Sequence, residues 1–149
     1  MKKILFSLVF VTVSFVQGFS QCGTPVASIS ENFDGAFPAC WFTNTVSHSS
    51  GFLYFNTGFG NAEWIVLPMV DNAKGILEFD ALNATNGQAG PGSFEFGVSS
   101  ESSANSMASF ELVEAQNIYY AASGGSLIYT HHVIDFSDYT GTGQYIVIG

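Results

Sequence analysis

Apolar and polar side chains alternate along much of this chain, and that pattern constrains its fold more than any other feature. In Leu77-Glu78-Phe79-Asp80-Ala81 and in Phe94-Glu95-Phe96-Gly97-Val98, every second side chain is apolar. A period of two is typical of a β-strand with one buried face and one wet face. No stretch repeats apolar residues at helical spacing over more than two turns, so the sequence predicts an all-β domain.

Nine segments have the composition of strands, because β-branched and aromatic residues recur in them between turns rich in Gly, Asn and Ser. About nine strands without helices favour two antiparallel sheets packed face to face, a β-sandwich of the jelly-roll type. The phenylalanines supply the bulky inward side chains of its core. The predicted strands are Ala27 to Phe33, Cys40 to Val46, Gly51 to Asn56, Glu63 to Met69, Ile76 to Leu82, Ser93 to Ser99, Ser109 to Ala115, Leu127 to Phe136 and Gln144 to Ile148.

The first twenty residues have the pattern of an export signal. Met1-Lys2-Lys3 precedes an apolar run from Ile4 to Val16, and small residues follow up to Ser20. We expect cleavage after Ser20, which leaves residues 21–149 as a single domain. A membrane anchor is the alternative, but the apolar run is shorter than the ~20 residues that span a bilayer.

Without residues 1–20, Lys74 is the only Lys or Arg against twelve Asp and Glu, and the formal charge is −11. Such a chain is a poor partner for nucleic acid, because phosphate binding depends on Lys and Arg. Anionic membrane surfaces are disfavoured for the same reason, and no membrane insertion is expected after cleavage. An acidic surface does suit an extracellular protein and the capture of divalent cations.

Cys22 and Cys40 both remain after export to an oxidising compartment, where thiols tend to pair. We therefore expect a disulfide that ties the mature N-terminus to the strand beginning near Trp41. One alternative makes Cys22 the lipidated first residue of a lipoprotein, although the bulky Gln21 precedes it. Another leaves one cysteine free and the other buried.

Three segments resemble, in the same order, the motifs of a known domain family. They are Glu31-Asn32-Phe33-Asp34-Gly35-Ala36-Phe37-Pro38-Ala39-Cys40-Trp41, then Glu63-Trp64-Ile65-Val66-Leu67-Pro68-Met69-Val70 with Leu77-Glu78-Phe79-Asp80, and finally Val133 to Gly141 with Gln144 to Ile148. They are similar to motifs of the cleaved-adhesin and choice-of-anchor J domains, relatives of the MAM jelly rolls.

The resemblance spans Glu31 to Ile148. It implies placement in surface or secreted proteins of Gram-negative bacteria, often exported by the type IX route and joined to peptidases or adhesive modules. The last strand of the family has no counterpart in this sequence. We therefore expect the chain to be a fragment whose domain continues beyond Gly149.

Calcium is the metal that an acidic secreted sandwich is best suited to hold, because Ca²⁺ takes six to eight oxygen ligands. The resemblance points first to Glu31 and Asp34 as ligands, with Asp135 as a further candidate. Their role would be structural, holding loops together. The alternative is that all three are solvated carboxylates on turns.

The histidines and strand acids do not predict a catalytic site. His131 and His132 are adjacent, so in a strand one should face the core edge and the other solvent. His48 is expected in a loop, and the chain has no Gly-x-Ser-x-Gly elbow. Glu78 and Asp80 share a strand face. Two such carboxylates could act as a pair in glycoside hydrolysis, but alternation already explains them as the outward, polar side of a half-buried strand.

Aromatic residues offer the better argument for ligand binding, since their rings can stack on sugars or on a protein partner. We expect core packing for most of them, but the adjacent Tyr119 and Tyr120 cannot both point inward. Phe59 lies in a Gly-Phe-Gly loop. Phe59, Tyr119 and Tyr120 are therefore the predicted ligand contacts. The aromatic residues considered are Trp41, Phe52, Tyr54, Phe59, Trp64, Tyr119 and Tyr120.

Together these features predict a secreted or cell-surface, non-catalytic adhesion module that binds an extracellular protein or glycan. Two alternatives come from other classes. One is an accessory N-terminal domain of a secreted peptidase or glycoside hydrolase. The other is a structural spacer domain that has no ligand.

Overall fold

The computed structural model describes residues 22–49, 51–55, 62–84, 92–103, 105–119, 121–123 and 126–149. This part of the chain is all-β, with one short helical turn, and its strands pair antiparallel. The predicted export signal and two of the predicted ligand contacts, Phe59 and Tyr120, lie outside these ranges.

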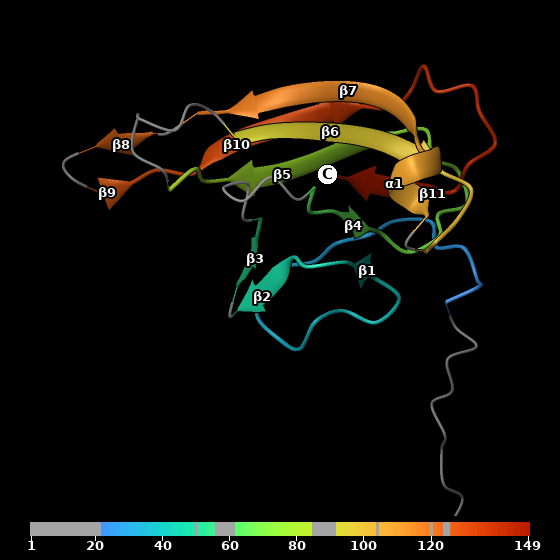
Figure 1. The fold of residues 1–149 in the computed structure, drawn as a ribbon, viewed down its shortest axis with the longest axis horizontal. Coiled ribbons are helices and arrows are strands. Elements are labelled where there is room, and N and C mark those ends of the chain that lie inside the picture. Colours follow the sequence, from blue (N-terminus) through green and yellow to red (C-terminus); the bar gives the residue numbers. More distant parts are fainter. Residues whose placement is uncertain are drawn as a thin grey trace, which may run out of the picture.

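The larger sheet has five strands in the order β1-β4-β11-β6-β7, and β6 and β7 form its long upper strands in Figure 1. Its longest pair, β6 with β7, shifts register between Phe96 and Gly97. The shift is a β-bulge, which bends the sheet locally. The strands are β1 (Phe42–Thr43), β4 (Ile65–Val66), β11 (Tyr145–Ile148), β6 (Gly92–Ser99) and β7 (Glu111–Ile118).

A second sheet, formed by β5 (Ile76–Ala81) and β10 (Thr130–Asp135), packs against the larger sheet through its apolar face. Alternation decides which side chains point inward. Phe96 of β6 and Ile134 of β10 lie in the main core with Phe136, and all three are at most 1% exposed. The two layers therefore form a β-sandwich, as the sequence predicts. The buried members of this core are Val70, Ala73, Phe96, Val98, Ile134, Phe136 and Tyr139.

A smaller cluster covers part of the opposite face of the five-stranded sheet. Tyr145 and Val147 of β11 lie there with Trp64 and Val66, while Ile146 and Ile148 pack against the main core. β11 is thus apolar on both faces, as expected for a strand in the interior of a sheet.

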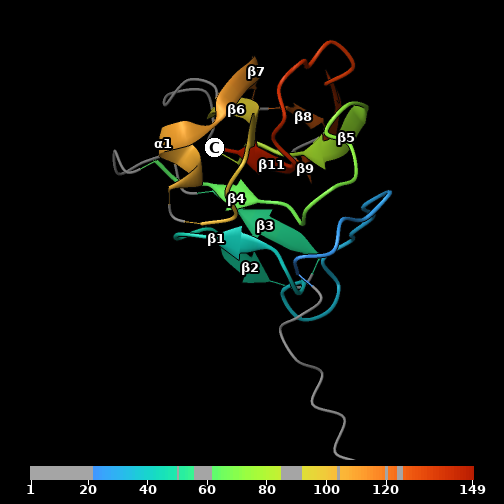
Figure 2. The same cartoon turned by 90° about the vertical axis from the view of Figure 1, so that its right-hand side faces the viewer.

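Two short hairpins and a helical turn complete the described elements. β2 (Ser47–Ser49) pairs with β3 (Phe52–Tyr54), and β8 (Ala122–Ser123) pairs with β9 (Ser126–Leu127). The β8–β9 hairpin projects beyond one end of the sheets in Figure 1, and β2–β3 lies near β1 in Figures 1 and 2. α1 (Ser106–Ser109) precedes β7. In the described part of the chain, no helix has the length and apolar character needed to cross a membrane.

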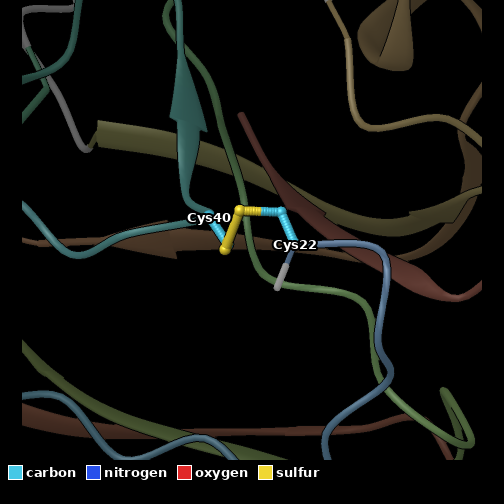
Figure 3. Close-up of a disulfide and its surroundings, with 2 residues drawn as sticks. All are labelled: Cys22 and Cys40. Carbon is cyan, nitrogen blue, oxygen red and sulfur yellow. A yellow bond between two sulfur atoms is a disulfide. The ribbon is translucent and has the colours of Figure 1, made fainter. Parts of the chain in front are cut away.

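Cys22 and Cys40 form the predicted disulfide (Figure 3). Just beyond Cys22, Val26 forms an isolated parallel bridge with Val70, in which the Val26 N–H donates to the Met69 carbonyl at 2.9 Å. The beginning of the described chain is thus held both covalently and by backbone pairing.

The predicted strand from Ala27 to Phe33 is wrong, because this segment contains no strand. Side-chain oxygens capture its backbone donors instead. The Glu31 carboxylate accepts the N–H groups of Asn32 and Phe33, and the Asn32 side chain accepts that of Asp34. Such local bonds favour turns over sheet ladders. Phe33 has a left-handed φ of 59°.

Two further expectations need correction. His48 does not lie in a loop, because β2 includes it, paired with Leu53 of β3. The predicted strand from Cys40 to Val46 shortens to β1, since Cys40 adopts a left-handed φ of 67° that ends extended backbone.

Candidate binding surface

Three exposed aromatic rings meet on one surface, and we call Phe52, Tyr54 and Tyr129 the aromatic platform. Phe52 and Tyr129 are stacked, with ring centroids 5.9 Å apart and planes within 6°. The Tyr54 ring lies 6.0 Å from Phe52 at a tilt of 58°. The three residues are 41%, 51% and 47% exposed in chain order. Large apolar groups are exposed together here, an arrangement that often marks a binding site.

Two serines lie on the same face of the β2–β3 hairpin as two of these rings. Ser49 is directly opposite Phe52, and Ser47 is directly opposite Tyr54. Residues opposite each other in an antiparallel pair point to the same face. All four side chains are exposed. The outer face of this hairpin therefore combines aromatic rings with hydroxyl groups and carries no charge.

The inner face of the hairpin is fixed to the turn that precedes Gly35. His48 Nε2 lies 3.0 Å from the Phe33 carbonyl oxygen, and because a carbonyl can only accept, this nitrogen donates. The His48 ring also contacts Phe33 and Phe37, with centroids 6.2 and 5.9 Å away. The Gly51 N–H donates to the same Phe33 carbonyl at 2.7 Å. These contacts orient the outer face.

The predicted ligand contacts do not include the three residues of the aromatic platform. Tyr119, one of the predicted ligand contacts, directly follows β7 and is 64% exposed. Phe52 and Tyr54 do not pack in the core as most aromatics were expected to do, whereas Trp64 does, at 7% exposure. Tyr129 was not singled out. Its signal was the run Leu127-Ile128-Tyr129, since three successive apolar residues in extended backbone cannot all face inward.

The candidate metal ligands are divided between two regions. Glu31 and Asp34 lie in one exposed turn, where the Asn32 amide donates to Asp34 at 2.9 Å. Asp135 ends β10. Within the described ranges, no three His, Cys, Asp or Glu side chains are grouped so that they could hold a metal ion. The three carboxylates therefore do not form one cluster.

Asp135 is instead engaged locally by the residue two positions further on. The Ser137 hydroxyl and the Ser137 backbone N–H both donate to the Asp135 carboxylate and hold the pKa of that carboxyl below its usual value of 3.8. The backbone bond is 2.8 Å long. This geometry is that of an Asx turn, which ends the strand.

The two adjacent histidines point to opposite faces, as predicted. His131 is exposed and lies 3.0 Å from Asp80, on the strand face that also carries the exposed Glu78. His132 is half-buried and stacks on Phe79 at a centroid distance of 5.3 Å.

The ring nitrogens of His132 connect the two sheets. One nitrogen lies 3.1 Å from Gln116 of β7, and the other lies 2.7 Å from Thr130 of β10. Gln116 in turn donates to Glu114 at 2.7 Å. His132 is thus part of a satisfied polar network between the layers, a structural arrangement.

A shallow depression of about 220 Å³ lies where Asp71, Asn72 and Ala73 approach the segment from Gly141 to Gln144. This volume falls below the ~300–1,000 Å³ typical of small-molecule sites. Asp71 is its only carboxylate. The aromatic platform is therefore the better candidate for a ligand site.

Comparison of the chain with protein-family models, with curated proteins and with solved structures finds no match.

Proposed function

We propose that this chain is a secreted or cell-surface, non-catalytic binding module whose ligand is an extracellular protein or glycan. The observation that carries the proposal is the exposure of Phe52, Tyr54 and Tyr129 as one cluster. A domain with no ligand has no need to keep three large rings in water, where burial of each would stabilise the fold. The export pattern of residues 1–20 and the disulfide support placement outside the cytoplasm.

Membership of the cleaved-adhesin and choice-of-anchor J domains, with jelly-roll connectivity and export by the type IX route, is part of this proposal. It is supported by the three sequence segments that resemble the family in order. The two packed antiparallel layers are compatible with such a domain. Attachment of the module to a larger exported protein follows from the same resemblance.

A structural calcium ion at the turn of Glu31 and Asp34 also belongs to the proposal. Two carboxylates in one exposed turn fit one side of a calcium site, and backbone carbonyls and water would supply the remaining oxygens. The Phe33 carbonyl of this turn already holds the β2–β3 hairpin. Calcium bound here would stiffen the support of the aromatic platform.

Calcium is expected to raise the melting temperature (Tm) of the protein by several degrees, because a ligand present at 100 times its Kd contributes about 2.7 kcal/mol. The measurement is thermal unfolding with added CaCl₂ and again after chelation. The double variant Glu31→Gln, Asp34→Asn should lose the response, and Asp138→Asn, at an exposed position outside this turn, is the control. A Tm that does not change with calcium would remove the metal from the proposal.

The proposed function itself is tested by applying the full-length chain, recovered from a host that exports it, to arrays of glycans and extracellular-matrix proteins. Saturable binding to a member of either array is the expected result. If the protein is folded and pure but binds to no member of either array, the proposed function is wrong. A structural spacer domain that has no ligand would then be the remaining interpretation.

A further inference from the structure

We propose that the aromatic platform binds a neutral glycan, with pyranose rings lying against Phe52, Tyr54 and Tyr129 and with Ser47 and Ser49 meeting the sugar hydroxyls. This inference rests on the proposed function and selects one of its two ligand classes. It follows from the shape, polarity, charge and size of the surface.

The orientation of the rings favours a flat ligand. The planes of Phe52 and Tyr129 are within 6° of each other, while the Tyr54 ring is tilted by 58° from Phe52, so two of the three rings are parallel. A cage for a quaternary ammonium ion needs rings that surround the cation. A pyranose presents a flat face of C–H groups, which packs against the exposed face of an aromatic ring.

The polar groups beside the rings are hydroxyls. Ser49 lies across from Phe52, and Ser47 lies across from Tyr54, so each ring of the hairpin has a hydroxyl next to it. Tyr54 and Tyr129 add phenolic hydroxyls of their own. A hydroxyl both donates and accepts, and it can therefore pair with a sugar hydroxyl in either direction.

Charge argues for a neutral sugar over an anionic one. The outer hairpin face, with Ser47, Ser49, Phe52 and Tyr54, contains no charged residue. Beyond the first twenty residues Lys74 is the only Lys or Arg, and it precedes β5, away from this hairpin in the sequence. A uronate or sulfated glycan would find no cation on the platform and would be repelled by the acidic chain.

The size of the surface favours a small ligand over a folded protein. Rings that are 41–51% exposed present roughly 300 Å² in total, given the ~150–250 Å² of each aromatic side chain. A stable protein–protein interface needs about 800 Å² on each partner. The platform alone falls well short of that area, whereas it can cover one or two sugar rings.

The test uses the full-length exported chain and isothermal calorimetry with named probes: soluble fragments of β-1,4-glucan, xylan and mannan, and oligogalacturonate as the anionic comparison. At least one neutral fragment should bind, with a Kd that changes little between low and high salt, because a neutral ligand is not screened. Phe52→Ala and Tyr129→Ala should each weaken binding roughly tenfold. The double variant Ser47→Ala, Ser49→Ala should weaken it less.

Two matched controls separate a local effect from loss of the fold. Tyr129→Phe keeps the ring and should bind within about twofold of the unaltered protein. Ile76→Ala removes a side chain that is 64% exposed on β5 and should not change the Kd. The Tm of every variant is measured, and since these positions are exposed, each should stay near that of the unaltered protein.

Several results would overturn the inference. If the glycan and matrix-protein arrays yield a protein ligand and no glycan, a neutral glycan is the wrong ligand class, and the proposed function as a binding module still holds. If a glycan binds with equal affinity to the Phe52→Ala and Tyr129→Ala variants, the site is wrong. If oligogalacturonate binds more tightly than every neutral fragment, the charge argument fails. Binding to nothing on either array removes the proposed function and this inference together.

Discussion

Gly97 shows how the absence of a side chain organises the larger sheet. It lies in β6 at the bulge, opposite Val147 of β11. A Cβ placed there would collide with the Phe110 ring and with the Glu111 carbonyl. Phe110 packs on the smaller cluster. The glycine therefore lets an aromatic ring approach the backbone of the sheet.

Replacing Gly97 with alanine should lower the free energy of unfolding by about 1–3 kcal/mol, because an added methyl group overpacks this contact. Denaturation in urea measures the change. Gly35→Ala is the matched control, since a Cβ at Gly35 has no neighbour within 4 Å. Equal stability of the two variants would mean that Phe110 does not cover β6 as described.

Side-chain direction was predictable where alternation was clear, and less so where it was not. Glu78, Asp80 and the opposed His131 and His132 lie as the period of two requires. Phe52 alternates in the same way, but alternation does not say whether a strand face is covered. The inner side of the β2–β3 hairpin contacts the turn at Phe33 through His48, whereas Phe52 and Tyr54 on the other face remain exposed.

Among the elements, the bounds of three strands were predicted well and those of others were not. β5, β6 and β11 begin and end within one residue of their predicted bounds. The predicted strand from Glu63 to Met69 is reduced to Ile65–Val66 of β4. Pro68 lacks an N–H for the ladder and contributes to this early end. β3 lies within the predicted strand from Gly51 to Asn56, whereas its partner β2 was missed because it consists of Ser, His and Ser, which have little strand propensity.

The disulfide joins two segments that do not belong to any long strand. Cys22 and Cys40 are separated by 18 positions, and the segment between them contains turns and one isolated bridge. Because few backbone ladders hold this loop, the covalent link should account for much of its order. It also fixes the chain just before β1 and just before the bridge at Val26.

Removing the link with Cys22→Ser, Cys40→Ser should cost about 3 kcal/mol of unfolding free energy, the value expected for closing a loop of this size in the unfolded chain. Guanidinium denaturation of the variant and of the oxidised protein measures the difference. Reduction of the unaltered protein should reproduce it. No difference between the oxidised protein and the variant would show that backbone pairing alone holds the segment.

At the scale of the whole molecule, the sandwich separates apolar from charged groups by layer. Phe96, Ile134 and Phe136 fill the space between the sheets, and the carboxylates of Glu78, Asp80 and Asp135 lie outside. The aromatic platform is an exception to this separation. Composition and alternation predicted the layers, whereas contact between Phe52 and Tyr129, from segments far apart in sequence, depends on tertiary packing that no local pattern encodes.

Whether the aromatic platform is the ligand surface of the folded domain is tested by an NMR titration of the full-length exported chain with the β-1,4-glucan, xylan and mannan fragments. A neutral fragment should shift the resonances of Ser47, Ser49, Phe52, Tyr54 and Tyr129. Those of Ile76 and Asp80, on the outer face of β5, should not move. Shifts confined to the outer face of β5, or none on the β2–β3 hairpin when a glycan is bound, would contradict it.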